Sequence, residues 1–424
     1  MAHDAARTPP AQPRPDPSAC VPASLSHALS PALDAPRPSP LPAAAQVVIV
    51  GGGVIGASIA FHLAEAGVRD VLLLERHTAA SGSSGKPIGG VRAQFSDPLN
   101  IRLGQRSLRA WREFAERPGA DVGLKSAGYL FLLGSDEAVA AFREAAALQR
   151  ELGVDSRIIS PGEAHRLCPY IGPWSGIVAA AYSPDDGYAL PKAAVLGYLR
   201  AARDLGAVVR THCTVTGIDT EGGTLRAVHT TSGTVRTGTV VCAAGAWSGG
   251  IGAMAGVPLP VTPLRRQIAL TGPLTPHPPR IPFTLDFEST LYFHNDDAGG
   301  LVLGLSDTRQ EPGFGRDFSE EWLEPFREAA ARRAPALAGL KPAGGWAGLY
   351  EMTPDRNALI GESTGVSRFL YATGFSGHGF LQAPAVGEIV RDLWLGREPF
   401  LDVGPLAASR FHGAWAARPE AHII

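Results

Sequence analysis

The fold follows from one stretch near the start of the chain, QVVIVGGGVIGASIAFHLAEAGVRDVLLLE at residues 46–75. Its first part, Val47–Val50, is a run of β-branched residues that predicts a short buried strand. A helical pattern of apolar residues follows and stops at Gly67, and Asp70–Glu75 predicts a second strand. A strand, a helix and a second strand in this order begin a parallel sheet.

The turn between the first strand and the helix has glycines at positions 51, 53 and 56. Gly51 permits the tight turn, Gly53 lets the backbone approach a pyrophosphate, and Gly56 lets the helix pack closely on the strand. The helix N-terminus offers unpaired N–H groups to the same anion. Glu75 ends the second strand, where a carboxylate binds ribose hydroxyls and repels a 2′-phosphate. The spacing predicts a dinucleotide site and disfavours NADP; the alternative is a glycine-rich turn that only packs an α/β core.

The bulk composition is that of an ordinary globular protein, and the length of 424 residues indicates two domains. The formal net charge of −2 gives no basic excess for binding nucleic acid. No apolar run is long enough to predict a membrane span. The four cysteines, at positions 20, 168, 213 and 242, are scattered, which argues against a metal site or a disulfide framework. We therefore expect no metal and a reducing, cytoplasmic location.

Residues 1–45 are rich in Pro and Ala and show no apolar periodicity. Such a segment buries too little surface to offset its ordering entropy, so we expect a disordered extension. It lacks the basic start and compact apolar region of a secretory signal. The alternative is a start codon placed too early.

Beyond Glu75 the regular alternation of strand and helix breaks down. Helical patterns at 99–115, 137–152, 192–205 and 318–333 are interspersed with strand patterns, and residues 262–308 have the alternation and turns of antiparallel strands. A strand at 369–372 then leads through a glycine-rich loop into a helix at 380–395. A domain that binds NAD normally continues through regular β-α-β units, so this break favours FAD.

Five short stretches stand in order along the chain: VVIVGGGVIG at 47–56, GGVRAQF at 89–95, AAGAWS at 243–248, GLYEMTPD at 348–355 and GFSGHGF at 374–380. Together they resemble the D-amino-acid oxidase superfamily of flavoproteins, in the branch that holds glycine oxidase, sarcosine oxidases and the catalytic subunits of proline dehydrogenase complexes. The resemblance spans residues 46 to about 400.

The resemblance implies an α/β fold with an α+β insertion, in which a Rossmann-like FAD-binding domain is interleaved with an antiparallel-sheet substrate domain. The strand and helix patterns agree with it. We assign residues 46–95, 185–262 and 340–404 to the FAD-binding domain, residues 96–184 and 263–339 to the substrate domain, and residues 405–424 to a tail.

The resemblance also implies which residues contact FAD. They are Gly51, Gly53, Val54, Ile55, Gly56, Glu75, Arg76, Ser83, Ser84, Lys86, Ala244, Gly245, Trp247, Gly374, Ser376, Gly377, His378, Gly379 and Phe380. In relatives the helix after this last group points its N-terminus at the flavin edge that becomes negative on reduction. Three alternatives stay open: a core role for Trp247, a solvated loop at 83–86, and a structural role for His378. Because Gly348 stands where covalent sarcosine oxidases have a cysteine, we predict non-covalent FAD.

Three residues are candidates for catalysis: Arg92 to hold a substrate carboxylate, Tyr350 as a polar group over the flavin face, and His378. Arg265, Arg266 and Arg356 are reserves for the carboxylate.

Sarcosine oxidases carry lysines where this chain has Leu381 and, in strand 300–306, Val302, and a histidine near Ser306. The lysine at Val302 is associated with oxygen activation, so its absence favours a dehydrogenase that uses another electron acceptor over O2.

The sequence thus predicts an FAD-dependent oxidoreductase that oxidises the C–N bond of an amino acid or similar small amine by hydride transfer to flavin, giving an imine that hydrolyses. One alternative is a non-catalytic, FAD-binding assembly factor or partner subunit, and another is an NAD-dependent dehydrogenase. The amine, the electron acceptor (O2 or another) and the state of association, as a homo- or hetero-oligomer, stay open.

Overall fold

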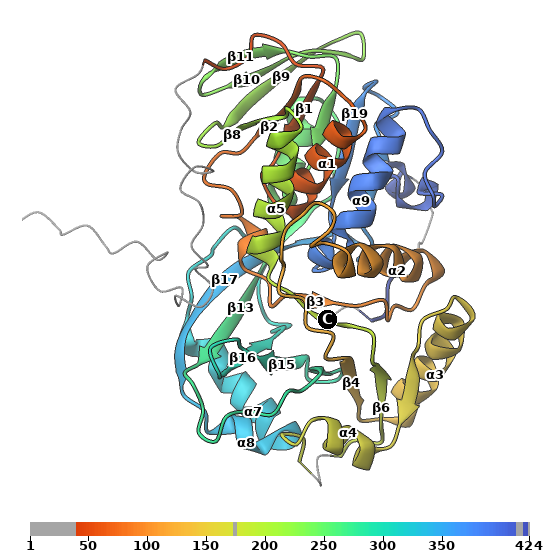
Figure 1. Cartoon of the computed structure of the whole chain (residues 1–424), viewed down its shortest axis with the longest axis vertical. Helices are drawn as coiled ribbons and strands as arrows, with labels where there is room; N and C mark the ends of the chain where they lie inside the picture. The colour runs from red at the N-terminus through yellow and green to blue at the C-terminus, as the bar shows by residue number, and fades with distance from the viewer. Residues whose placement is uncertain (1–39, 173–175, 413–418, 423–424) are drawn as a thin grey trace, which may run out of the picture.

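The computed structural model describes residues 40–172, 176–412 and 419–422, which form two parts around separate sheets (Figure 1). The upper part in Figure 1 contains a six-stranded sheet of strand order β18-β19-β12-β1-β2-β8. Its strands are β1 (Val47–Val50), β2 (Val71–Leu74), β8 (Val208–Arg210), β12 (Val240–Cys242), β18 (Leu359–Glu362) and β19 (Phe369–Thr373). Neighbours are parallel except β18, which runs antiparallel to β19. The parallel pairing of β1 with β2 confirms the predicted β-α-β start.

Helices cover one face of the six-stranded sheet (Figure 1). They are α1 (Val54–Glu65), α5 (Pro191–Asp204) and α9 (Gly379–Trp394), with α2 (Pro98–Arg112) below them. Because side chains alternate along a strand, Val47 and Ile49 point into the core under these helices, and Val48 and Val50 point the other way. The second face packs against α6 (Ser248–Met254) and a small antiparallel sheet, β9 (Val215–Glu221), β10 (Thr224–Thr230) and β11 (Gly233–Arg236).

The lower part contains an eight-stranded sheet of order β17-β13-β16-β15-β14-β4-β6-β5. Its strands are β4 (Tyr129–Leu133), β5 (Arg157–Ile159), β6 (Ala179–Ser183), β13 (Thr262–Thr271), β14 (Phe283–Asp286), β15 (Leu291–Asn295), β16 (Leu301–Leu305) and β17 (Pro342–Met352). All neighbours are antiparallel except the parallel pair of β14 and β4. One face packs against α3 (Asp136–Glu151), and the other against α4 (Pro161–Leu167), α7 (Leu323–Arg333) and α8 (Pro335–Ala338).

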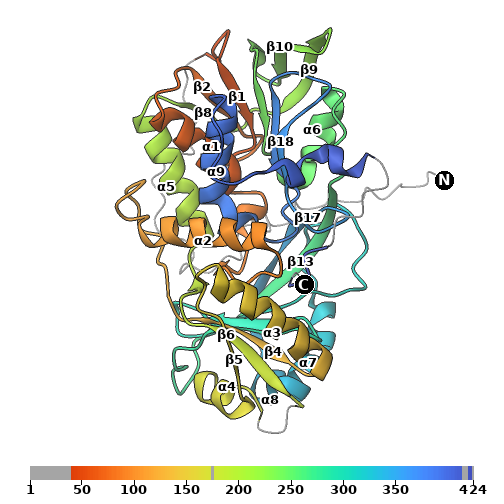
Figure 2. The same cartoon turned by 90° about the vertical axis from the view of Figure 1, so that its right-hand side faces the viewer.

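The chain passes between the two parts several times. The six-stranded sheet takes its strands from residues 47–74, 208–242 and 359–373, and the strands of the eight-stranded sheet come from the sequence between them. This confirms the predicted fold class of an α/β part interleaved with a largely antiparallel one. Figure 2 shows β13 and β17 between the two parts.

The domain boundaries drawn from sequence stay predictions. Two elements pack against the part of the fold to which their segment was not assigned. α2 falls within the segment assigned to the substrate domain, yet it packs against α9 through Leu103, Leu108 and Trp111. β17 falls within the segment assigned to the FAD-binding domain, yet it pairs with β13 along its length. Each element's partners are distant in sequence, so local patterns do not place it.

The disordered extension was predicted to run to residue 45, and this is wrong at its end. The N–H of Ala45 donates to the carbonyl of Arg236, and the N–H of Arg236 donates to the carbonyl of Ala43. Residues 43–45 therefore pair with β11. Residues 1–39 lie outside the described residues.

The predicted tail at 405–424 is partly ordered on the fold. The guanidinium of Arg410 binds both carboxylate oxygens of Asp355, at 2.8 and 2.9 Å, with both side chains buried. Residues 419–422 pack between the two parts, next to the site described below.

Candidate functional site

Two adjoining cavities lie along the first sheet and between the two parts. We call them the dinucleotide cavity, which contains the glycine-rich turn, and the junction cavity, which lies between the sheets. Each encloses more than 1000 Å³ of empty space, about 1270 and 1150 Å³ respectively including the parts open to solvent. Val54, Ile55, Ser83, Ser84 and Glu351 line both, so together they form one elongated site.

The glycine-rich turn forms the floor of the dinucleotide cavity. Gly51 has φ +120°, and a Cβ there would lie 2.2 Å from the carbonyl oxygen of Ala243, so only glycine fits. A Cβ on Gly53 would lie 2.9 Å from Oγ of Ser84, and this hydroxyl accepts a hydrogen bond from the N–H of Val54 at 2.9 Å. The start of α1 therefore presents backbone N–H groups to the cavity, next to the hydroxyl of Ser84.

Glu75 lies at the end of β2 in the same cavity, as its position in the sequence predicts. Its Oε2 accepts from the N–H of Gly52 at 2.8 Å, and its Oε1 accepts from the N–H of His77 at 2.9 Å. Two backbone donors thus fix the carboxylate, and each oxygen keeps a lone pair for a ribose hydroxyl.

An aromatic and cationic cluster stands at the rim of this cavity. The guanidinium carbon of Arg76 lies 3.8 Å from the centre of the Trp247 ring, and that of Arg316 lies 5.6 Å from it. Phe314 stacks on the same ring with 5.6 Å between ring centres. Trp247 therefore lines the cavity and is not a core tryptophan.

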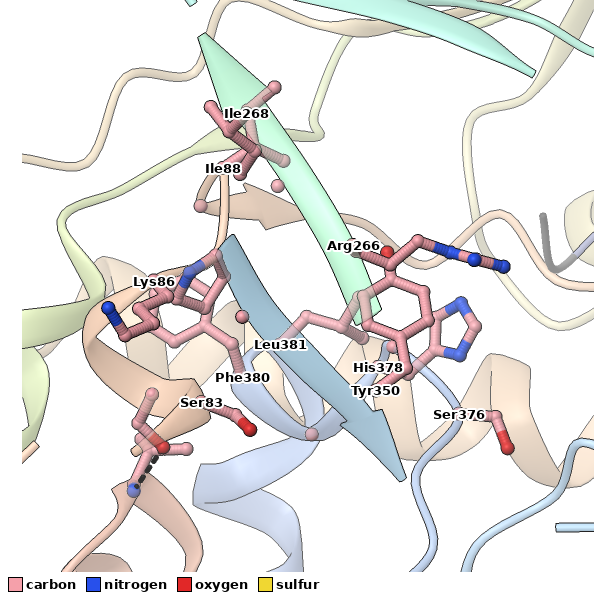
Figure 3. A pocket seen from close by; sticks show the side chains of 18 of the residues that line it. Ser83, Lys86, Ile88, Arg266, Ile268, Tyr350, Ser376, His378, Phe380 and Leu381 are labelled. Atoms are coloured by element: carbon pink, nitrogen blue, oxygen red, sulfur yellow. Dashed lines mark hydrogen bonds between the residues drawn. The ribbon is translucent and has the colours of Figure 1, made fainter. Parts of the chain in front are cut away.

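The start of α9 lines the junction cavity. Ser376, Gly377, His378 and Phe380 come from it or from the loop before it, and Tyr350 comes from the end of β17. Figure 3 shows Arg266, Tyr350 and His378 together on one side, with Lys86 and Phe380 on the other.

Tyr350 is held by close packing on a glycine. A Cβ on Gly377 would lie 2.6 Å from the Tyr350 ring, and Gly377 has φ +103°. Burial raises the pKa of the Tyr350 phenol, against the opposing charges of Arg266 and Arg92. The hydroxyl therefore stays protonated and available as a hydrogen-bond donor.

Arg92 is 4% exposed, and three groups around it act as acceptors for its Nη atoms. One Nη atom donates to the carbonyl of Gln94, and the other lies 3.1 Å from Nε2 of His378 and 2.7 Å from the carbonyl oxygen of His422. The ring of Phe95 lies 4.1 Å from its guanidinium carbon. Arg92 thus holds the wall of the junction cavity.

His378 is neutral in this arrangement. Burial, and then the charge of Arg92, lowers its pKa well below the usual value. Its Nδ1 lies 3.2 Å from the carbonyl oxygen of Phe375, so Nδ1 carries the proton and Nε2 accepts from Arg92.

The segment at residues 419–422 contributes His422 to the wall of the junction cavity. The His422 ring lines the cavity and stacks on Phe142, with 4.0 Å between ring centres. The Glu420 carboxylate accepts from the N–H and the hydroxyl of Ser96, at 2.9 and 2.6 Å, and from the N–H of His422 at 2.9 Å. The predicted tail is therefore part of the cavity wall.

Glu351 lies where the two cavities meet. Its Oε2 accepts from the hydroxyl of Thr373 at 2.8 Å and from the N–H of Gly374 at 3.0 Å. Burial raises its pKa, and these donors oppose the shift. Glu351 belongs to the stretch GLYEMTPD, but no role was predicted for it from the sequence.

The structure brings together most of the predicted residues. The dinucleotide cavity is lined by Gly51, Gly53, Val54, Ile55, Glu75, Arg76, Ser83, Ser84, Ala244, Gly245 and Trp247. The junction cavity is lined by Lys86, Arg92, Tyr350, Ser376, Gly377, His378, Gly379 and Phe380, besides the shared residues. The loop at 83–86 thus faces the site, in keeping with its functional interpretation.

Four named residues do not line either cavity. Gly56 serves packing, because a Cβ there would lie 2.0 Å from the carbonyl oxygen of Gly51. Gly374 acts through its bond to Glu351. Of the reserve arginines, Arg265 binds Gln310 and the carbonyl of Asp317, and Arg356 is absent from both walls, whereas Arg266 lines the junction cavity.

Some lining residues were missed because their partners are distant in sequence. They are Arg316, Glu351, His422 and the aromatic group of Tyr129, Phe283 and Tyr292. Glu351 lies within the stretch GLYEMTPD, so its place in the site could have been predicted from that motif. No sequence pattern pointed to the others.

The site fits an FAD molecule. The dinucleotide cavity offers backbone donors and a hydroxyl for a diphosphate and a carboxylate for a ribose, and the junction cavity continues from it with largely apolar walls. Among residues 40–172, 176–412 and 419–422, no cluster of three His, Cys, Asp or Glu side chains could bind a metal ion. None of the helices in the same ranges is both long and apolar enough for a membrane span.

Comparisons with known proteins agree with this geometry. The family profile described as FAD dependent oxidoreductase (DAO) matches residues 46–393. The chain is 33% identical to FAD-dependent oxidoreductase domain-containing protein 1 of Bos taurus, over 90% of this chain and 87% of that protein. It is 28% identical to the mitochondrial dimethylglycine dehydrogenase of Mus musculus over 88% of its own length, but spans only 44% of that protein.

Among solved structures, L-proline dehydrogenase from P. horikoshii superposes with a TM-score of 0.82 and 34% identity, covering 88% of this chain and 99% of that one. These matches confirm the resemblance drawn from the five sequence stretches and the assignment of FAD as the cofactor. The chain therefore belongs to the D-amino-acid oxidase (DAO) family of FAD-dependent oxidoreductases.

Proposed function

We propose that this protein oxidises the C–N bond of a small amino acid or related amine. The observation that carries the proposal is the junction cavity, where Arg92 and Arg266 and three tyrosines lie in otherwise largely apolar walls. Bound FAD supplies the flavin ring that accepts a hydride from the substrate carbon. The protein's own residues bind the substrate, exclude water and set its protonation state.

Arg266 is the better anchor for a substrate carboxylate. Its Nε is buried without a hydrogen-bond partner among the described residues, and its Nη1 makes only long contacts of 3.3 and 3.4 Å, to the carbonyls of Arg265 and Asp307. A carboxylate that enters a dry cavity needs such a cation. Arg92, the first candidate from the sequence, already donates to three acceptors, so we assign it a positioning role through His378 and His422.

The same cavity favours the neutral amine. The guanidinium groups of Arg92 and Arg266 repel an ammonium ion, and the apolar side chains of Ile268, Phe283 and Leu285 desolvate it. Both effects lower the pKa of a bound amine, and only the neutral amine can lose a hydride from the adjacent carbon. The Tyr350 hydroxyl then remains as a polar group that orients the substrate.

The names of two relatives support a small amino acid and an acceptor other than O2, since one is a dimethylglycine dehydrogenase and the other an L-proline dehydrogenase. Val302 and Ser306, which replace the lysine and histidine of sarcosine oxidases, favour the same choice. A cytoplasmic location stays a prediction, and the mouse relative is named as mitochondrial.

Anaerobic titration of the FAD-loaded protein tests the proposal. Glycine, sarcosine, dimethylglycine, D- and L-proline and a set of D-amino acids are added in turn, and the absorbance of oxidised flavin is followed. We expect one group of amines to bleach it, and Arg266→Met to keep FAD while needing about tenfold or more substrate for half-reduction. If no amine bleaches bound flavin, the non-catalytic assembly factor or partner subunit becomes the better account.

A further inference from the structure

We propose that Arg316 is an additional cofactor-binding residue, which contacts the diphosphate of FAD and closes the dinucleotide cavity from the side of the second part. It lies in residues 307–319, here called the crossing segment, which connect β16 with the short helix Glu320–Trp322. This inference concerns the cofactor alone and does not depend on the proposed substrate.

The crossing segment is attached to the eight-stranded sheet on both sides of Arg316. Before it, the N–H of Gly313 donates to the carbonyl of Pro263 at 2.9 Å. Arg265 then spans the segment, because its Nε donates to Oε1 of Gln310 at 2.9 Å and its Nη1 to the carbonyl of Asp317 at 3.1 Å. Arg265, considered from sequence as a substrate ligand, therefore fixes the backbone that presents Arg316.

The side chains of the segment reach across to the first part. Arg316 lines the dinucleotide cavity, and both it and Phe314 approach the ring of Trp247, which Arg76 also contacts. Phe314 is 52% exposed, an unusual position for a phenyl side chain. Its ring stacks on Trp247, which lines the same cavity as the glycine-rich turn.

The cationic side chains around the two cavities have no carboxylate partner among the described residues. Arg76, Lys86 and Arg316 make no ion pair within 4 Å of a carboxylate in the part of the chain that the structure describes. Burial, followed by the charge of Arg316, lowers the pKa of Lys86, and the same two effects lower the pKa of Arg76 against Glu75. Arg316 thus repels both Arg76, which lines the same cavity, and Lys86, which lines the adjoining junction cavity.

Glu75 offsets part of the charge of Arg76, but neither carboxylate in the dinucleotide cavity forms an ion pair with Arg76 or Arg316. Glu75 is engaged by the N–H groups of Gly52 and His77, and Glu351 by Thr373 and Gly374. A diphosphate carries two negative charges and several acceptor oxygens, and guanidinium groups bind such oxygens in charge-assisted pairs. The diphosphate of FAD is the anion that this arrangement lacks, held by α1 and Ser84 on one side and by Arg316 on the other.

Titration of the apoprotein with FAD at several salt concentrations tests the proposal. The test variant is Arg316→Gln, and the matched control is Arg309→Gln, on the same segment but paired with Asp307 at 3.0 Å. We expect Arg316→Gln to raise the Kd for FAD about tenfold or more at low salt, since a hydrogen bond to a charged group is lost. It should also flatten the dependence of Kd on salt, and Arg309→Gln should change neither.

A Kd of Arg316→Gln equal to that of the wild-type protein would overturn the proposal, as would a raised Kd with unchanged salt dependence. If Arg316→Gln does not fold, the proposal is tested in the wild-type protein instead, by measuring the rate of trypsin cleavage after Arg316 with and without FAD. The proposal requires FAD to slow this cleavage more than cleavage after Arg309, and equal rates with and without FAD contradict it.

Discussion

Nη2 of Arg92 lies 3.1 Å from Nε2 of His378 and 2.7 Å from the carbonyl oxygen of His422. The guanidinium of Arg92 thereby joins the start of α9 to His422, which lies 330 positions beyond Arg92 along the chain. The contact fixes the neutral tautomer of His378 and seats residues 419–422 against the junction cavity. Arg92 and Arg266 line the same cavity, but of the two it is Arg266 whose Nε is buried with no hydrogen-bond partner among the described residues.

The two arginines should therefore respond differently to the same substitution. Arg92→Met leaves several buried acceptors unpaired, so we expect it to lower the free energy of unfolding by about 2–4 kcal/mol. Arg266→Met should cost less stability and mainly raise the KM for the amine. Denaturant unfolding of both FAD-loaded variants checks the first statement and steady-state kinetics the second. The reverse pattern, a stable Arg92→Met with a raised KM, would restore Arg92 as the carboxylate ligand.

The docking of residues 419–422 should depend on pH through two opposing groups. Burial, and then Asp97, raises the pKa of Glu420 from 4.5 to about 7, and burial, then Arg92, lowers that of His422 from 6.5 to about 3. Docking is therefore weakened by Glu420 as pH rises from about 4.5 to 7, and strengthened by His422 as pH rises from about 3 to 6.5. In the wild-type protein these effects oppose each other between about pH 4.5 and 6.5.

Single substitutions should separate the two effects. With Glu420→Gln, docking should strengthen as pH rises to about 6.5, whereas with His422→Phe, which keeps a ring on Phe142, it should weaken up to about pH 7. Hydrogen exchange at the N–H groups of residues 420–422, corrected for intrinsic rates, reports docking. The same pH dependence in both variants would show that these groups are not buried as described.

Residues 419–422 should also limit which amines enter. Deletion of residues 419–424 removes the His422 ring and carbonyl from the cavity wall. We expect the KM for the smallest substrate to rise about tenfold and bulkier amines to be accepted. The exposed His412→Ala is the control and should behave as the wild-type protein does. An unchanged substrate range after the deletion would place these residues outside the functional cavity.

Gly377 should be required for the position of Tyr350. In Gly377→Ala the new methyl group would start 2.6 Å from the Tyr350 ring, at a φ of +103°. We expect flavin reduction at saturating amine to slow about tenfold or more because the substrate is misplaced. Gly396→Ala is the matched control, since Gly396 has φ +66° with no atom within 4 Å, and it isolates backbone strain. Equal rates in both variants would mean that Tyr350 does not orient the substrate.

FAD should leave the protein on denaturation. Gly348 lies beside Lys86, with 3.0 Å between a Cβ built there and the Lys86 Cβ, and no cysteine is among the described residues that line the junction cavity. Acid precipitation of the yellow protein should therefore release the flavin into the supernatant, where its absorbance is measured. Flavin that stays with the pellet would contradict non-covalent binding.

The local parts of the fold could be predicted from sequence. The turn at Gly51–Gly56, the place of Glu75 and the last helix follow from residue spacing within about 30 positions, where periodicity and glycine geometry act. Helix ends were predicted to within a few residues, as for α3 at Asp136–Glu151.

Non-local features could not be predicted in this way. Nothing near Arg316 or His422 in sequence indicates that each crosses to another part of the fold, and nothing near Arg92 shows that distant groups already occupy its donors. The partners of α2 and β17 are likewise set by packing between segments far apart in the chain.

A single-turnover experiment tests most directly whether this protein couples oxidation of an amine C–N bond to reduction of bound FAD. FAD-loaded protein is mixed without oxygen with an excess of the amine that reduces it, and the reduced flavin and the carbonyl product are both counted. We expect one carbonyl group for each flavin reduced, together with one amine, which is released from an acyclic substrate and stays on the same molecule for a cyclic one such as proline. Flavin that stays oxidised with every amine, or becomes reduced without a carbonyl product, would contradict it.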